Sequence, residues 1–196
     1  RDIYLNRLIA SKHNGLIKII TGLRRCGKSY LLFKLFKEHL RNVGVDDNHI
    51  IQVDLEDRRN KNLRNPDVLL AHIDSKMKDN DMYYILLDEV QCVKDFEDVL
   101  NSYLKIENAD IYVTGSNSKF LSTDIITEFR GRGTQICVHP LSFAEIMSVD
   151  QRHPIDVWND YYTYGGLPLV LSLSTDEAKE SYLKDLYAKV YLTDIK

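Results

Sequence analysis

A short segment near the amino terminus combines glycines, a lysine and a serine at a spacing suited to phosphate binding. Residues 22–29 read GLRRCGKS and match the pattern GxxxxGK[S/T] at every fixed position. In this pattern the glycines let the backbone curl, so that several N–H groups point at phosphate oxygens. The lysine, here Lys28, reaches the β- and γ-phosphates, and the hydroxyl of Ser29 is a ligand for Mg²⁺. The segment therefore predicts a phosphate-binding loop.

The surroundings of this loop fit the prediction better than a chance glycine-rich turn does. An apolar, β-branched run at 16–21 precedes the loop and predicts a buried strand, and an amphipathic run over about 28–41 predicts a helix. A helix amino terminus adds partial positive charge. The backbone amides around Cys26 are expected to lower the pKa of its thiol. The residues expected to contact the nucleotide are Gly22, Arg24, Arg25, Cys26, Gly27, Lys28, Ser29 and Tyr30.

Two carboxylates stand at the end of a second apolar segment, YYILLDE at 83–89. Paired acids suit a core strand only where they emerge at its carboxyl end, which is the edge where open α/β sheets bind ligands. We expect Asp88 to hold Mg²⁺, directly or through water. We expect Glu89 to polarise an attacking water. Taken alone, the segment is equally typical of an acidic helix cap, but its pairing with the phosphate loop favours the catalytic interpretation.

A small polar cluster follows another apolar run, in VTGSNS at 113–118. Either Asn117 or Ser116 is positioned to hydrogen-bond the attacking water or the γ-phosphate, and we favour Asn117 slightly. Ordinary turn chemistry is the alternative, because glycine, serine and asparagine are common loop residues.

Two arginine-bearing segments are weaker candidates. FRGRG at 129–133 offers guanidinium groups that could stabilise transition-state charge, with Arg132 favoured over Arg130. A solvated loop or a contact to a phosphate backbone would explain them equally, and action on a neighbouring subunit would require an oligomer. The basic run at 58–64 is interpreted as a solvated loop, with nucleic-acid contact as the minor alternative.

The elements that position these residues alternate between strands and helices. The predicted strands are 16–21, 49–54, 83–87, 111–114 and 135–138, and the helices between them are about 28–41, 65–73 and 96–104. This alternation predicts a three-layer α/β fold with a five-stranded, mostly parallel sheet covered by helices on both faces. After Pro140 the pattern changes to two helices separated by GGLP. We therefore expect a nucleotide-binding core over 1–140 and a helical appendage, a lid or a linker, over 141–196.

Composition excludes several classes of protein. The 196 residues are 44% hydrophobic and 28% charged, which are ordinary globular values and exclude disordered and collagen-like chains. The formal net charge of −3 argues against a dedicated basic coat for nucleic acid. Three cysteines without paired spacing and six scattered histidines argue against a disulfide framework or a zinc site. No apolar run is long enough for a membrane span, so the cytoplasm is the expected compartment. Because the chain starts at Arg1 rather than Met, we expect it to be an excerpt, trimmed at one or both ends.

In their order along the chain, these motifs resemble the predicted bacterial and archaeal ATPases of the AAA superfamily. The segments that carry the resemblance are GLRRCGKS, YYILLDEVQ, YVTGSNSKFLS, RGR, HPLSFAEI, YGGLP and YLTDI. GKS and LLDE are shared with many P-loop proteins, whereas TGSNS, RGR, PLSF and YGGLP are more specific to this group. The likeness covers nearly the whole chain.

The resemblance implies a five-stranded P-loop NTPase core of the additional-strand catalytic-glutamate type, with the Glu-bearing strand between the P-loop strand and the neighbouring layer. It implies ATP as the nucleotide, with Lys28, Ser29, Asp88 and Glu89 in the roles given above, and it places Arg132 near a nucleotide or subunit contact. Family members typically continue past the YLTDI-like helix into a C-terminal domain of unsettled function, through which nucleic acid could be bound. A homo-oligomer is compatible with the sequence.

The main hypothesis is an ATPase in which Mg²⁺-dependent hydrolysis drives a conformational switch. A small-molecule kinase is one alternative, and phosphate release without an added acceptor would separate the two. A nucleotide-gated nucleic-acid-binding switch with little turnover is the other, and salt-dependent DNA binding would support it.

Overall fold

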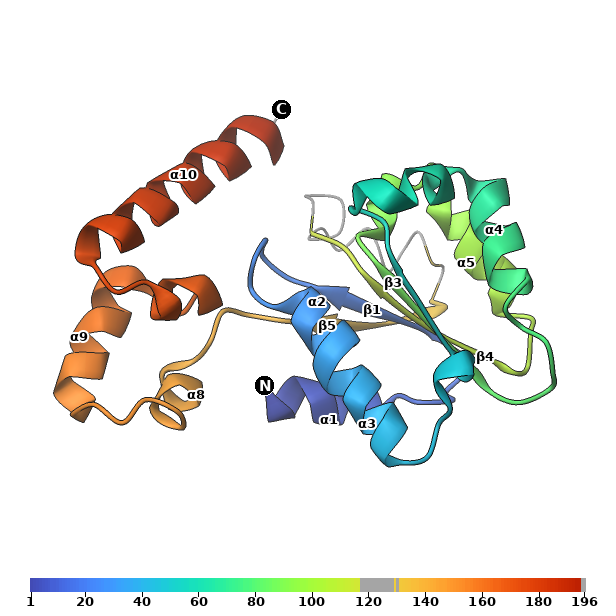
Figure 1. Cartoon of the computed structure of the whole chain (residues 1–196), viewed down its shortest axis with the longest axis horizontal. Coiled ribbons are helices and arrows are strands. Elements are labelled where there is room, and N and C mark those ends of the chain that lie inside the picture. The colour runs from blue at the N-terminus through green and yellow to red at the C-terminus, as the bar shows by residue number, and fades with distance from the viewer. Residues whose placement is uncertain (117–128, 130, 195–196) are drawn as a thin grey trace.

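The computed structural model describes residues 1–116, 129 and 131–194 and contains one five-stranded sheet (Figure 1). Its strands are β1 (Ile17–Thr21), β2 (Ile50–Asp54), β3 (Tyr83–Asp88), β4 (Ala109–Thr114) and β5 (Gly133–Cys137). Their order across the sheet is β2-β3-β4-β1-β5, and every neighbouring pair is parallel. The predicted parallel α/β fold is confirmed.

The sheet order corrects one detail of the expected topology. Strand β4, and not the Glu-bearing β3, lies next to the P-loop strand β1, while β3 lies between β4 and β2. The order of strands in a sheet depends on the crossover connections between distant segments. The alternation of residues within one strand does not specify that order. Because all the strands are parallel, their carboxyl ends meet at one edge, where the segments that follow β1, β3 and β4 come together.

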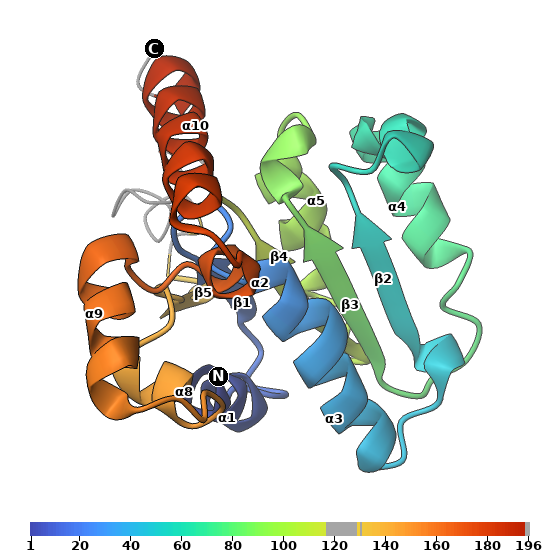
Figure 2. The same cartoon turned by 60° about the vertical axis from the view of Figure 1, so that its left-hand side comes forward.

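Helices cover both faces of the sheet (Figure 2). One face carries α4 (Pro66–Asp74) and α5 (Phe96–Tyr103), and the other carries α1 (Asp2–Ala10) with a continuous helical stretch made of α2 (Lys28–Tyr30), the π-helical η1 (Leu31–Phe36) and α3 (Lys37–Asn42). Short 3-10 turns are η2 (Asp47–His49), η3 (Arg58–Arg64), η4 (Val90–Cys92) and η5 (Pro168–Ser172). The helices that follow the sheet are α8 (Phe143–Met147), α9 (Pro154–Tyr164) and α10 (Asp176–Asp194).

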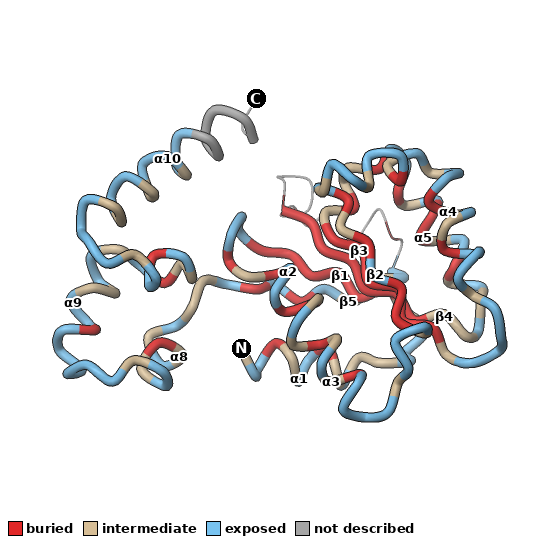
Figure 3. Tube along the Cα trace, in the orientation of Figure 1, coloured by how far each residue is buried: buried red, intermediate tan, exposed pale blue. Residues whose placement is uncertain are grey.

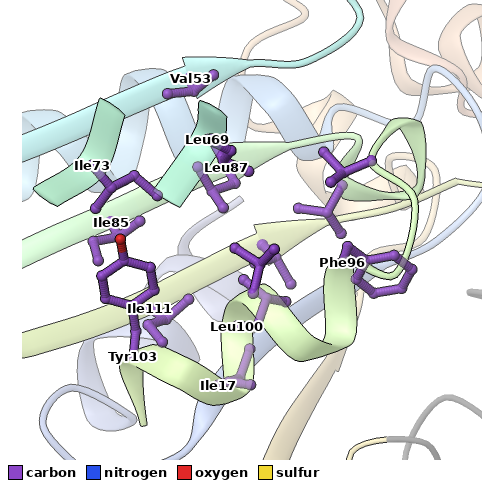
Figure 4. Close-up of a cluster of buried hydrophobic side chains, with 14 of the residues drawn as sticks. Ile17, Val53, Leu69, Ile73, Ile85, Leu87, Phe96, Leu100, Tyr103 and Ile111 are labelled. Carbon is purple, nitrogen blue, oxygen red and sulfur yellow. The ribbon is translucent and has the colours of Figure 1, made fainter. Parts of the chain in front are cut away.

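Alternating strand residues build two separate cores, one on each face. Beneath α4 and α5, buried side chains such as Ile85 and Ile111 pack against Leu69 and Leu100 (Figure 4). On the opposite face, residues including Ile20 and Tyr112 pack against α1 and the P-loop helix. Burial is concentrated in the sheet, as Figure 3 shows. Two covered faces explain why the strands read as nearly continuous apolar runs.

Two helices do not follow from apolar periodicity. Helix α1 presents only two buried residues, Tyr4 and Leu8, one helical turn apart, and this stripe is too short to stand out. Helix α8 begins at Ser142, whose hydroxyl accepts from the backbone N–H of Glu145 while the Glu145 carboxylate accepts from the N–H of Ser142. This capping box corresponds to the sequence pattern S-x-x-E, which is typical of a helix amino terminus. The pattern at 142–145 therefore predicts the start of α8.

The helices after Pro140 lie to one side of the sheet (Figure 1). Gly166 joins them to the segment that leaves β5, since its carbonyl accepts from the N–H of Leu141 at 2.7 Å. A Cβ at Gly166 would lie 1.9 Å from the carbonyl oxygen of Leu141, which explains why glycine stands there. The domain boundary at residue 140 stays a prediction. Among the described residues, no helix combines the length and apolar character needed to cross a bilayer.

Candidate functional site

The loop that follows β1 is shaped by close backbone packing and left-handed residues. Gly22 has φ +140°, and a Cβ there would lie 2.1 Å from the carbonyl oxygen of Val138. Arg25 and Gly27 have φ of +62° and +96°, in the left-handed region where a side chain is disfavoured and glycine is at ease. This curl ends at Lys28, the first residue of α2. The loop therefore ends at a helix amino terminus, as the motif requires.

Cys26 belongs to this loop, and its side chain packs against the neighbouring backbone at Val138. The thiol is buried and donates to the carbonyl oxygen of Val138 at 3.3 Å. Burial raises the pKa of the Cys26 thiol, although the nearby charges of Lys28 and Arg1 oppose the shift. The expectation of a lowered pKa is therefore wrong, because loss of solvent outweighs the surrounding amides and cations.

Lys28 is buried, and its ammonium group lies at the inner side of the loop. The Nζ atom donates to the carbonyl oxygens of Gly22 at 3.1 Å and Leu23 at 3.0 Å. These two bonds tie the side chain to the start of the loop and leave one of its three N–H donors for another acceptor. The geometry holds a positive charge at the point where the backbone curls.

Asp88 ends β3 as a buried carboxylate surrounded by hydroxyl groups. Its Oδ1 accepts from the Thr114 hydroxyl at the end of β4. Burial raises the pKa of the Asp88 carboxyl, while hydrogen bonds from Thr114 and Ser29 act in the opposite direction. The Ser29 side chain thus lies near the Asp88 carboxyl. Two oxygen donors in a poorly solvated position fit a hard divalent cation such as Mg²⁺, whose charge would favour the ionised carboxylate.

Glu89 follows in a left-handed backbone conformation, with φ of +55°. Its N–H donates to the Thr114 hydroxyl at 3.0 Å, so this hydroxyl bridges the backbone of Glu89 and the side chain of Asp88. The Glu89 Oε2 atom accepts from the Ser116 hydroxyl at 2.7 Å and from the side-chain amide of Gln91. Ser116 is among the residues predicted from sequence, whereas Thr114 and Gln91 are not, although both lie within the TGSN and DEVQ segments that carry the local signal.

The loop and Glu89 border one cavity of about 300 Å³. Its lining residues are Arg24, Arg25, Gly27, Lys28, Ser29, Tyr30, Glu56 and Glu89. Most of the predicted nucleotide contacts are therefore brought together, whereas Gly22 and Cys26 contribute to loop packing. Arg24 forms an ion pair with Glu56 at 3.3 Å, and Arg25 stacks over the ring of Tyr182 in α10 at 5.4 Å. Both arginines thus connect the loop to other elements.

Arg132 is not brought to this cavity. It precedes β5, and its carbonyl accepts from the N–H of Ile17 at the start of β1, so it lies at the sheet edge opposite the P-loop. Its guanidinium group contacts the Asn101 side chain at 3.5 Å. Asn117 and Arg130 lie outside the described residues. In the basic run at 58–64, Arg59 pairs with Asp57, which fits a solvated segment.

Comparison with known families gives one match that covers most of the chain. Residues 14–147 match the model of the family described as AAA domain. The match spans the loop at 22–29, the acidic pair and β5, together with the segments between them.

Two curated relatives align with the whole chain. An uncharacterised protein of Haemophilus influenzae is 32% identical over 201 residues, which is all of this chain and 50% of that protein. An uncharacterised protein of Methanocaldococcus jannaschii is 28% identical over all of this chain and 44% of that protein. The chain thus spans about half the length of these relatives. Statements about the activity, substrates and partners of the whole protein are therefore proposals.

Solved structures share the fold at low identity. A DNA polymerase III gamma subunit-related protein of Thermotoga maritima is 13% identical, with a TM-score of 0.56 over 90% of this chain and 56% of that one. PCH-2 of C. elegans is 14% identical, with a TM-score of 0.54 over 90% and 61%. AMPPCP-bound DnaA of Aquifex aeolicus is 12% identical, with a TM-score of 0.51 over 96% and 60%. At these identities the likeness concerns the fold alone.

Proposed function

The chain belongs to the AAA domain family of P-loop ATPases, and from this premise we propose that it binds ATP with Mg²⁺, hydrolyses it, and couples hydrolysis to a conformational change. The observation that carries the proposal is the convergence of Lys28, Ser29, Asp88 and Glu89 at one edge of the sheet. Lys28, Ser29 and Glu89 line the same cavity, and the Ser29 side chain lies close enough to Asp88 to lower the pKa of its carboxyl. Catalysis of phosphoryl transfer depends mainly on such positioning and electrostatics.

Nucleotide binding falls to the loop at 22–30. Its backbone N–H groups and the amino terminus of α2 would receive the phosphates, and the Lys28 ammonium group would supply a positive charge to the β- and γ-phosphates. Arg24, Arg25 and Tyr30 also line the cavity and would contact the nucleotide there. Gly22 and Cys26 would act through the loop conformation that they maintain.

Ser29 and Asp88 would hold Mg²⁺, because they are neighbouring oxygen donors beside the cavity that Ser29 lines. When bound, the ion supplies charge neutralisation between phosphate oxygens. Thr114 would orient Asp88 through its hydroxyl hydrogen bond.

Glu89 would act as the general base. As the water oxygen bonds to the γ-phosphorus, the bond from that phosphorus to the ADP oxygen breaks, and the water proton passes to the Glu89 carboxylate. The products are ADP and phosphate, and the carboxylate returns its proton to phosphate or solvent. Asn117 stays a candidate for orienting the water. Arg132 lies at the opposite sheet edge, so it would reach a nucleotide only on a neighbouring copy, and this role requires an oligomer.

Removal of the divalent ion tests the proposal directly. With ATP and Mg²⁺ but no phosphate acceptor, the protein should release phosphate continuously. Excess EDTA should abolish release, and Mg²⁺ added beyond the chelator should restore it, because Ser29 and Asp88 cannot neutralise phosphate charge without the ion. A coupled phosphate-release assay measures all three conditions. Formation of ADP that requires an added acceptor and proceeds without phosphate release would instead indicate a kinase.

Replacement of Lys28 with alanine should weaken ATP binding by about 10- to 100-fold, since charge-assisted hydrogen bonds contribute about 1.5–3 kcal/mol each. Equilibrium titration with a fluorescent ATP analogue measures this change. Lys34→Ala is the matched control, because Lys34 is exposed on the same helical stretch and should leave affinity unchanged. Equal affinities for the two variants would remove Lys28 from the proposed binding site.

A further inference from the structure

Gln91 lies in η4, two residues after Glu89, and its side chain turns back onto the acidic pair. The Gln91 Nε2 atom donates to Oε2 of Glu89. The hydroxyl of Ser116, a buried residue just after β4, donates to the same oxygen at 2.7 Å. Two segments that follow the neighbouring strands β3 and β4 thus both donate to one carboxylate oxygen.

The other end of the Gln91 amide has no partner among the residues that the structure describes. Its Oε1 atom is buried and accepts no hydrogen bond from any described residue. An unpaired buried carbonyl costs free energy, and a glutamine serving only to fill space would be expected to satisfy both ends. Turning the amide around would bring its oxygen against the Glu89 carboxylate, which is electrostatically unfavourable. The N–H contact to Glu89 is therefore the interaction that fixes this side chain.

The hydrogen bonds from Gln91 and Ser116 make the two carboxylate oxygens of Glu89 unequal. Both hydrogen bonds terminate on Oε2, and no described residue donates to Oε1. The backbone of Glu89 is fixed by its own bond to Thr114. The two bonds thereby orient the carboxylate through Oε2, and within the described part of the chain Oε1 stays available to accept a proton.

We propose, on the basis of the function proposed above, that Gln91 is a positioning residue for ATP hydrolysis. Its amide N–H, together with the Ser116 hydroxyl, fixes the Glu89 carboxylate so that Oε1 meets the attacking water. Gln91 acts through Glu89 and makes no contact with the nucleotide. Its loss should therefore lower kcat and leave nucleotide affinity unchanged, because misplacement of a base by about 1 Å can cost about 100-fold in rate.

The test compares steady-state ATP turnover and nucleotide affinity across a set of variants. Gln91→Leu should lower kcat by about 10- to 100-fold with the Kd for ATP within about twofold of the parent value. Gln91→Met, which keeps the length of the side chain, should behave alike and replaces the leucine variant if that protein does not fold. Ser116→Ala, which removes the second donor, should also lower kcat without changing affinity. Gln151→Leu makes the same change at an exposed position and should leave both quantities unchanged.

A double variant separates positioning from a structural role. In a Glu89→Gln background, Gln91→Leu should cause no further loss of turnover, because a residue that acts through Glu89 has nothing left to position. A further loss of about 10-fold in that background would overturn the inference, as would unchanged kcat in both Gln91 variants of the parent protein. Absence of turnover in the parent protein would overturn the proposed function and this inference together. Parent turnover with insensitive Gln91 variants would overturn the inference alone.

Discussion

Glutamine in place of Glu89 is expected to reduce ATP turnover by about 10²- to 10⁴-fold, the range typical of a lost general base. The amide keeps nearly the size of the carboxylate but cannot accept the water proton. Nucleotide affinity should stay unchanged, because the loop and Lys28 are not altered. Single-turnover phosphate release measures the chemical step, and equilibrium titration with a fluorescent ATP analogue measures affinity.

Glu56→Gln is the matched control for this substitution. Glu56 lines the same cavity and loses the same charge when it is changed, but its carboxylate pairs with Arg24 at an exposed position. Turnover should therefore change by less than about threefold, as expected for an exposed ion pair. Equal losses for the two variants would indicate a general effect of cavity charge and would contradict a base at Glu89. Unchanged turnover in Glu89→Gln would exclude the assignment.

The parts of this site that could be predicted are short motifs of contiguous residues. The GxxxxGK[S/T] loop, the apolar run before it and the acids after β3 each carry their own local signal. The carboxyl ends of parallel strands lie at the same edge of a sheet. A parallel sheet therefore places these motifs together, and no additional sequence signal is needed. This is why residue type and spacing are enough to group Lys28, Ser29, Asp88 and Glu89.

The parts that could not be predicted depend on neighbours distant in sequence or on backbone shape. Thr114 contacts Asp88 across 26 residues, and this contact exists only because β4 lies beside β3. The left-handed backbone of Glu89 turns its carboxylate towards Ser116 and Gln91, and residue types alone do not specify that turn. Arg132 illustrates the opposite case. An arginine is chemically suited to stabilise transition-state charge, but Arg132 precedes β5 and therefore lies at the sheet edge opposite the phosphate loop.

The P-loop strand contains a further feature that local pattern does not reveal. Lys18 in β1 has no exposed surface, and burial lowers the pKa of its ammonium group while the Asp110 carboxylate opposes that shift. Its ammonium group pairs with the buried carboxylate of Asp110, at the start of β4. Asp110 also accepts from the hydroxyl of Tyr112 at 2.8 Å and from the N–H of His13 at 3.1 Å. Lys18 and Tyr112 are register partners. The network joins the strand that carries the phosphate loop to the strand that carries Thr114.

Asparagine in place of Asp110 is therefore expected to lower the free energy of unfolding by about 3–5 kcal/mol, the usual cost of breaking a buried ion pair by removing one partner. The amide can still accept hydrogen bonds, but it leaves the Lys18 ammonium group without a counter-charge. Urea denaturation followed by circular dichroism measures the change. Asp81→Asn is the control, because the Asp81 side chain is 82% exposed and its loss should cost less than about 1 kcal/mol.

Removing both charges separates the electrostatic cause from packing. A Lys18→Met and Asp110→Leu double variant should recover much of the stability lost in Asp110→Asn, because a well-packed apolar pair often replaces a buried ion pair without loss. If the double variant is no more stable than Asp110→Asn, loss of the acceptor for Tyr112 and His13, which leucine cannot replace, costs as much as the uncompensated charge. A loss below about 1 kcal/mol in Asp110→Asn would contradict the view that this pair stabilises the alignment of β1 with β4. The expected loss is a large share of the about 5–15 kcal/mol that keeps a domain folded, so the strand that carries the phosphate loop depends on a contact at its opposite end.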